Sequence, residues 1–135
     1  KTVYALVFIA AFALTSTACL YGTAEDTIQK SFQVRPGGQL ILETDLGSIE
    51  IDTSNTNTLE IDVIKEARTG SSRRAEEILE DFEISFRKDG NTVYVNGDHN
   101  RSGISRFWEN IGNHVRIHFL ISLPRVFNVD LKTSG

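Results

Sequence analysis

From residue 28 onward, apolar and polar residues alternate along the chain, and a period of two is the pattern of β-strands with one buried and one wet face. The alternation predicts strands at residues 38–45, 49–52 and 59–63. It breaks at Leu46-Gly47, which predicts a turn between the first two of these strands. The three segments look alike, which indicates a weak internal repeat.

One helix is predicted to interrupt the strands, between residues 72 and 82. After the breaker Gly70, Ser71 or Ser72 can cap its N-terminus. Its carboxylates face outward as a solvated surface rather than as a catalytic pair. Its apolar residues fall at helical spacing and form one stripe, which consists of Ala75, Ile78, Leu79 and Phe82.

The second half of the chain returns to strands. Asp89-Gly90 is a strong hairpin signal between two of them, and Pro124 ends the longest one. Residues 97–113 are irregular, with a short helical turn predicted at 104–111. The strands are expected at residues 84–86, 92–95, 115–123 and 127–131.

The N-terminal region has the features of an export signal. Residues 3–14 are uncharged and mostly apolar, too short a run to cross a hydrocarbon core of about 30 Å as a helix, but suited to a secretory signal. We therefore assign residues 1–24 to a signal peptide and residues 25–135 to an exported β-rich domain of the cell envelope. The cut is expected after Ala18 or after Ala24, since both are small residues.

Cys19 is the only cysteine, so it forms no internal disulfide. Thr17, Ala18 and Cys19 match the end of a bacterial lipoprotein signal, although Ser16 stands where such signals have Leu. Two interpretations stay open. Either Cys19 is lipidated and residues 20–27 tether the domain to the membrane, for example as an outer-membrane lipoprotein, or Cys19 is discarded with the signal and the domain is free in the periplasm or displayed on the cell surface.

The net charge is −4, and the basic residues are scattered rather than clustered. Nucleic-acid grooves and anionic lipid surfaces both attract clusters of Lys and Arg. We therefore expect no nucleic-acid partner, and a membrane association only through a lipid anchor.

Two motifs suggest metal sites, and both fail. His114 and His118 lie on a predicted strand, where a separation of four residues spans about 13 Å, too far for two ligands each about 2 Å from one zinc ion. Asn96, Asp98 and Asn100 are spaced like the first ligands of a calcium loop, but the later Gly and Glu of that loop are missing. A turn stabilised by their side chains is the preferred interpretation.

The sequence also lacks a nucleophile elbow and a phosphate-binding glycine loop. We therefore expect no catalytic residues, no cofactor and no enzymatic activity.

Phe107 and Trp108 are the most conspicuous aromatic pair. They could anchor a protein or sugar partner, or they could cover the open end of the β core. The sequence favours the cap and leaves the partner site as the alternative.

Residues 115–135, VRIHFLISLPRVFNVDLKTSG, resemble the bacterial putative-adhesin family of unknown function, in which two strands lead to a Thr-Ser-Gly turn. Residues 38–51, GQLILETDLGSIEI, resemble the first rung of the same family. The resemblance implies an exported β-helix or β-roll-like stack of short strands with one inserted amphipathic helix. It also implies that the chain is the N-terminal part of a longer solenoid with later rungs after Gly135.

Two functional hypotheses follow. The first is a non-enzymatic, adhesin-like β-solenoid module of the cell envelope that binds a surface partner. The second is a structural or regulatory periplasmic lipoprotein without an adhesive ligand.

Overall fold

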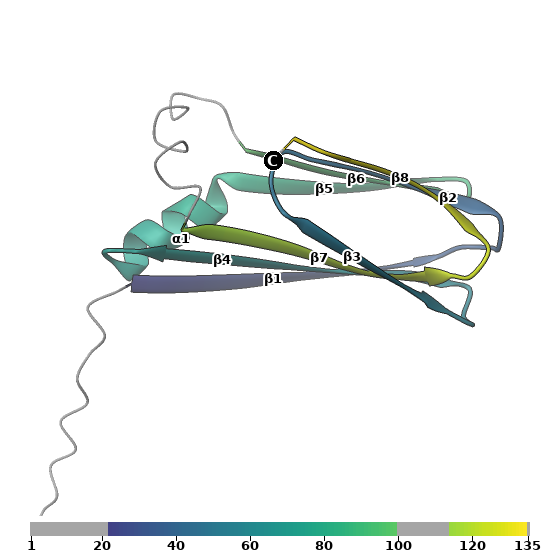
Figure 1. Ribbon diagram of the computed structural model, residues 1–135, viewed down its shortest axis with the longest axis horizontal. Coiled ribbons are helices and arrows are strands. Elements are labelled where there is room, and N and C mark those ends of the chain that lie inside the picture. The colour runs from purple at the N-terminus through teal and green to yellow at the C-terminus, as the bar shows by residue number, and fades with distance from the viewer. Residues whose placement is uncertain (1–21, 100–113, 135) are drawn as a thin grey trace, which may run out of the picture.

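The computed structural model describes residues 22–99 and 114–134, which form two four-stranded β-sheets that face each other, with one helix at one end (Figure 1). This confirms a mainly β fold with one helix. In chain order the elements are β1 (Gly22–Gln33), β2 (Gly38–Thr44), β3 (Ser48–Ser54), β4 (Thr58–Thr69), α1 (Ser72–Glu80), β5 (Phe82–Asp89), β6 (Thr92–His99), β7 (Val115–Pro124) and β8 (Phe127–Thr133).

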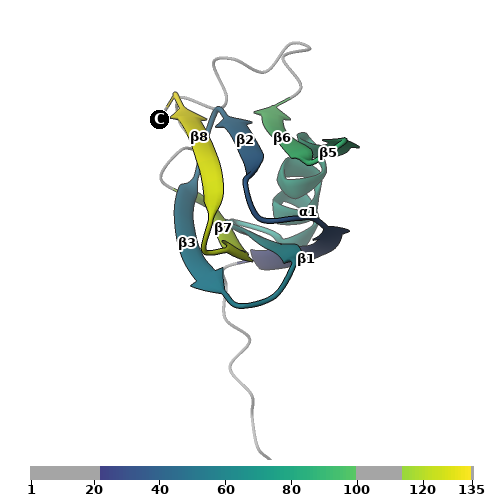
Figure 2. The ribbon, with the colours of Figure 1, turned by 90° about the vertical axis from the view of Figure 1, so that its right-hand side faces the viewer.

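Both sheets are mixed, and neither closes on itself. The first sheet has the order β1-β4-β7-β3, with antiparallel pairs except for β3, which runs parallel to β7. The second has the order β5-β6-β2-β8, in which β5 and β6 are antiparallel while β2 runs parallel to both β6 and β8. Figure 2 shows the two layers from the side, with β3 and β8 on one side and β1 and β5 on the other.

Only part of this architecture has the rung-like arrangement that the resemblance implies. The unit β2–β3 passes from the second sheet to the first, and the unit β7–β8 passes from the first to the second. The two units lie against each other through the parallel pairs β3–β7 and β2–β8. The pairs β1–β4 and β5–β6 are antiparallel instead, and the short connection between β5 and β6 allows no other direction. These strands therefore do not form a full β-helix.

The predicted alternation agrees with the burial pattern. Leu59, Ile61 and Val63 of β4 are fully buried between the sheets, and the intervening Glu60 lies outside. The helix buries Ala75, Ile78 and Leu79 against one end of the core. Its cap is Ser71, whose hydroxyl accepts a hydrogen bond from the backbone N–H of Arg74 at 3.3 Å.

The predicted turn at Leu46-Gly47 is confirmed, and it carries the chain from one sheet to the other. Gly47 has φ +130°, in a region that side chains rarely adopt, and a Cβ there would lie 2.9 Å from the carbonyl oxygen of Ile117. The hydroxyl of Thr44, which is buried, donates a hydrogen bond of 2.8 Å to the carbonyl of Leu46. Glycine at this position is therefore required by both conformation and space.

Two predictions about segments were wrong. The expected tether, residues 20–27, overlaps β1, because Gly22 to Thr27 pair with β4 from Thr69 to Ile64. The sequence predicts that an irregular stretch begins at residue 97, but β6 continues to His99, which pairs with Phe82 of β5. In both places polar residues form strands because a neighbouring strand satisfies their backbone groups. The predicted helical turn at 104–111 lies outside the described residues.

Candidate functional site

Several residues singled out in the sequence lie outside the part of the chain that the structure describes. They include the candidate lipidation site Cys19, the candidate partner-binding residues Phe107 and Trp108, and Asn100 of the calcium-like run. Their proposed roles stay predictions.

Of the candidate metal ligands that the structure describes, His118, Asn96 and Asp98 lie on strands and His114 does not. His114 is exposed just before β7, while the Nδ1 atom of His118 lies 2.6 Å from the hydroxyl oxygen of Ser48 on β3. Asn96 and Asp98 lie in β6 rather than in the turn that we expected, opposite residues of β5. Within residues 22–99 and 114–134, no group of three or more His, Cys, Asp or Glu side chains could hold a metal ion.

A more distinctive feature is the side of the molecule where β3 and β8 are the outermost strands (Figure 2). The core-facing positions of these strands carry Ile49, Ile51, Val129 and Leu131. Val129 and Leu131 lie beside the fully buried Leu40 and Leu42 of β2, yet their exposed fractions are 40% and 43%. We call these four residues and the outer edges of β3 and β8 the open side.

The opposite side of the sandwich is constructed differently. There the outermost strands β1 and β5 carry charged residues at core-facing positions, namely Asp26, Lys30 and Lys88, each paired in register with a buried residue of the next strand. The ammonium group of Lys30 lies 5.7 Å from the ring centre of Phe86, which connects the two layers. Inward charges on an edge strand oppose the addition of another strand. Among the residues that the structure describes, one side is therefore protected against strand addition, and the open side carries no such inward charges.

β8 shows what kind of strand the sandwich accepts at such an edge. It lies parallel on β2 with apolar residues facing the core, and its outward Lys132 places the ammonium nitrogen 2.9 Å from a carboxylate oxygen of Glu43 on β2. The hydrogen bond and the charge of Glu43 raise the pKa of Lys132. An added strand is therefore fixed by backbone pairing, apolar contacts on one face and a charge pair on the other.

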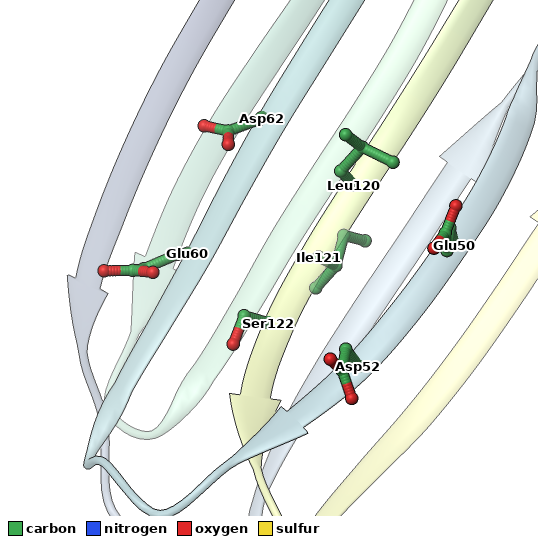
Figure 3. A pocket seen from close by; sticks show the side chains of 7 residues that line it. All are labelled: Glu50, Asp52, Glu60, Asp62, Leu120, Ile121 and Ser122. Atoms are coloured by element: carbon green, nitrogen blue, oxygen red, sulfur yellow. The ribbon is translucent and has the colours of Figure 1, made fainter.

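The outer face of the first sheet is acidic near the open side. Glu50 and Asp52 of β3 and Glu60 and Asp62 of β4 flank Leu120 and Ser122 of β7, around a shallow hollow of about 200 Å³ (Figure 3). None of the four carboxylates forms an ion pair within the described part of the chain. This face therefore presents unneutralised negative charge to any strand that adds beside β3.

A buried lysine connects the helix to the first sheet. Lys65 occupies a core-facing position of β4, with a side chain only 7% exposed. Its ammonium nitrogen lies 2.8 Å from a carboxylate oxygen of Asp26 on β1 and donates a 3.2 Å hydrogen bond to the carbonyl of Leu79, in the last turn of α1. The end of α1 favours a cation such as this ammonium group, since helix C-termini carry partial negative charge.

The sequence did not reveal the open side or Lys65. Ile49 and Ile51 look like any other core residues, because alternation identifies the inward face of a strand but not whether the strand has a neighbour. A lysine at a core-facing position of the alternation was the available signal for the buried ion pair.

In comparisons with known proteins, no family model and no curated protein matches the chain. Among solved structures, the crystal structure of a putative adhesin from Bacteroides fragilis is similar with a TM-score of 0.42 at 12% sequence identity, over 80% of this chain. The matched region spans 41% of that protein's length. A similarity of this degree does not establish a shared fold.

Proposed function

We propose that this chain is a non-enzymatic, adhesin-like module of the bacterial cell envelope that binds other polypeptide through the open side. The observation that carries the proposal is the contrast between the two sides of the sandwich. β1 and β5 place charges inward at their edges. By contrast, β3 and β8 present Ile49, Ile51, Val129 and Leu131 beside an edge that pairs with no further strand among residues 22–99 and 114–134. Unprotected apolar edges of this kind are templates for strand addition.

The same edges support the proposal that the module is the beginning of a β-solenoid. β2 with β8 and β3 with β7 already pair in parallel, as stacked rungs do. The register places Thr133 beside Thr44, and the N–H of Ser134 donates a 3.1 Å hydrogen bond to the carbonyl of Thr44. The chain thus leaves β8 alongside the residues that begin the crossing from β2 to β3. A further segment of the same kind would lie on β3, where it would compete with another polypeptide for the same edge.

The alternative function, a structural or regulatory lipoprotein, is favoured by the position of β1. Gly22 is buried against the start of α1, where a Cβ would overlap the backbone of Ser71. A cut after Ala24 would remove this contact and three residues that pair with β4, whereas a cut before Cys19 leaves β1 intact. This supports processing at Cys19, with a lipid anchor close to the folded domain. Described residues include no helix that is long and apolar enough to cross a membrane.

Attachment of producing cells to protein-coated surfaces tests the first function. We expect the double variant Val129→Lys/Leu131→Lys to lose attachment, because two charges on the open side oppose strand addition. Val126→Lys is the matched control, since Val126 is also apolar and 66% exposed but lies between β7 and β8. Equal attachment by all three proteins would contradict a binding role of the open side.

Acyl labelling and cell fractionation test the alternative. A structural lipoprotein predicts that Cys19→Ala moves the protein from the membrane to the soluble fraction, while attachment does not depend on Val129 or Leu131. In the binding function, Trp108→Ala distinguishes the two roles of the aromatic pair: a partner site loses attachment with unchanged stability, and a cap loses stability.

A further inference from the structure

We infer that the edge of β3 binds an extended polypeptide segment in which apolar and basic residues alternate. The inference rests on the proposed function in one respect, namely that the open side accepts strands. It adds the chemistry of the partner and names the strand that receives it. The reasons lie in the two rows of side chains that β3 presents beside its open edge.

The inward row of β3 is apolar. Ile49 and Ile51 are only partly buried, although the residues of β7 that pair with them, Phe119 and Ile121, are buried. In an added strand every second side chain points to the same face of the sheet. Apolar side chains at those positions would cover the two isoleucines and extend the core by one strand, which removes apolar surface from water.

The outward row of β3 is acidic. Glu50 and Asp52 alternate with the two isoleucines and border the hollow on the outer face of the first sheet (Figure 3). Residues directly opposite each other on neighbouring strands have Cβ atoms about 4.5–5.5 Å apart, close enough for opposite charges to attract. Lysine or arginine at the outward positions of an added strand would therefore lie beside both carboxylates and neutralise them.

The chain already contains a strand pair of this kind. β8 lies on β2 with Val129 and Leu131 facing the core, and its outward Lys132 forms the 2.9 Å ion pair with Glu43. A segment on β3 would repeat this arrangement with two carboxylates in place of one. The partner therefore needs basic residues at two successive outward positions.

The edge of β8 offers a different set of charges. Its outward residues are Asn128, Asp130 and Lys132, so its one carboxylate lies next to an ammonium group along the same face. A basic segment would gain one attraction and one repulsion at this edge. β3 is therefore the strand of the open side that selects a basic partner.

Fluorescence anisotropy of a labelled peptide tests the preference for basic residues. The probe has seven residues, as β3 has, begins and ends with valine, and carries lysine at every second position. A comparison peptide carries glutamate in place of lysine. Titrated with the full chain, the lysine peptide should bind at least about tenfold more tightly, because like charges directly opposite oppose strand pairing. Equal affinities, tighter binding of the glutamate peptide, or no binding of either would each overturn the inference.

A third peptide tests whether the apolar row is needed. It keeps the lysines and carries serine in place of valine, so it retains the charge and loses the side chains that would cover the isoleucines. We expect its affinity to fall at least about tenfold, since serine buries little apolar surface. Binding as tight as that of the valine peptide would show attraction between charges alone, and the inference of strand addition would be wrong.

Two matched double variants test which carboxylates take part. Glu50→Gln/Asp52→Asn and Glu60→Gln/Asp62→Asn each remove two charges from the same face. Those of β4 lie three strand spacings from an added strand, about 14 Å, which exceeds the Debye length of about 8 Å at physiological salt. We expect the β3 variant to weaken binding of the lysine peptide about fivefold or more, and the β4 variant less than about twofold. Equal losses would assign binding to the overall acidity of the face and contradict a strand on β3. Far-UV circular dichroism confirms that each variant keeps its fold.

Cross-linking locates the peptide on the sheet. In a Cys19→Ser background, Ser48→Cys places a thiol at an outward position of β3, and Asn128→Cys is the matched position on β8. Two lysine peptides each carry one cysteine in place of the first or the last lysine, so that the remaining lysines can still lie beside Glu50 and Asp52. Neighbouring strands lie about 4.8 Å apart, within the Cα separations of about 4.4–6.8 Å that disulfides require.

In a glutathione redox buffer we expect one of the two peptides to cross-link to the Ser48→Cys chain, and the one that reacts reports the direction of the added strand. Cross-linking to the Asn128→Cys chain should be weaker for both peptides. Equal or stronger reaction on β8 would refute the choice of β3 as the receiving strand.

The outcomes separate this inference from the proposed function. If no peptide binds, but Val129→Lys/Leu131→Lys still abolishes cell attachment, the open side binds a polypeptide of different chemistry and only the inference is wrong. If the lysine peptide binds at β3 and attachment does not depend on the open side, the adhesive function is wrong and the inference stands.

Discussion

Removing the exposed partner of the buried ion pair should destabilise the fold more than removing the buried lysine itself. Asp26→Ala leaves the ammonium group of Lys65 inside the protein with only the carbonyl of Leu79 as a partner. Lys65→Met replaces the buried charge with an apolar chain of similar length and leaves Asp26, whose side chain is 52% exposed, to be hydrated. The two substitutions break the same contact with different consequences.

The structure sets the magnitude. Breaking a fully buried pair by removing one partner costs about 3–5 kcal/mol, whereas replacing it with well-packed apolar groups is often neutral. Because Asp26 is half exposed and the Leu79 carbonyl remains, water can reach part of the site. We therefore expect Asp26→Ala to lower the free energy of unfolding by about 1–2 kcal/mol and Lys65→Met to change it by less than about 1 kcal/mol. The double variant should resemble Lys65→Met.

Urea unfolding followed by far-UV circular dichroism measures these differences, provided that the slope against urea concentration stays constant. Lys132→Met is the matched control, because it removes a lysine whose side chain is 73% exposed from an ion pair of similar length. It should leave the midpoint of urea unfolding nearly unchanged, because water already screens this exposed pair. If Lys65→Met proves more damaging than Asp26→Ala, the amine contributes net stability, and the reasoning from desolvation is refuted.

Three further predictions concern local features. Gly47→Ala should lower the free energy of unfolding in urea by about 1–3 kcal/mol, because Gly47 has a positive φ and lies close to a carbonyl oxygen. Gly70→Ala should be tolerated, because a Cβ there meets nothing within 4 Å. Ser71→Ala should lower the free energy of unfolding by about 1 kcal/mol, because the helix loses its cap. An unchanged midpoint of urea unfolding would contradict that role. Glu43→Gln should lower the pKa of Lys132 toward its ordinary value in an NMR titration. Because the pKa of Lys132 is raised in the folded state, the ion pair stabilises the fold below the pKa of the unfolded state. This contribution is lost as the pH rises through the folded-state pKa. Glu43→Gln should therefore change stability less in strongly alkaline solution.

Much of the fold could be predicted because alternation is a local property. Leu40, Leu42 and the inward residues of β4 and β7 are buried as their spacing predicts, and the helix begins after Ser71. The turn at Gly47 was also visible, since glycine breaks the alternation there. β1 was missed because its inward positions include Asp26 and Lys30, which disrupt the apolar half of the pattern at an edge.

The candidate site was much less predictable. The sequence drew attention to His114, His118 and a calcium-like run, because those side chains are recognisable without a fold. Ile49 and Leu131 were recognised only as inward residues. Their importance comes from the strand that is missing beside them in the described structure, and no local pattern records the neighbours of a strand.

The sequence by itself determined which face of each strand points inward, where the helix begins and where the chain turns, because each depends on residues a few positions apart. Only the tertiary structure decided which strands are neighbours, that parallel and antiparallel pairs occur in the same sheets, and that one side of the sandwich carries charges while the other stays apolar. The physical reason is that strand pairing is made by backbone groups common to all residues. Side chains then select among the pairings through contacts between segments far apart in the chain.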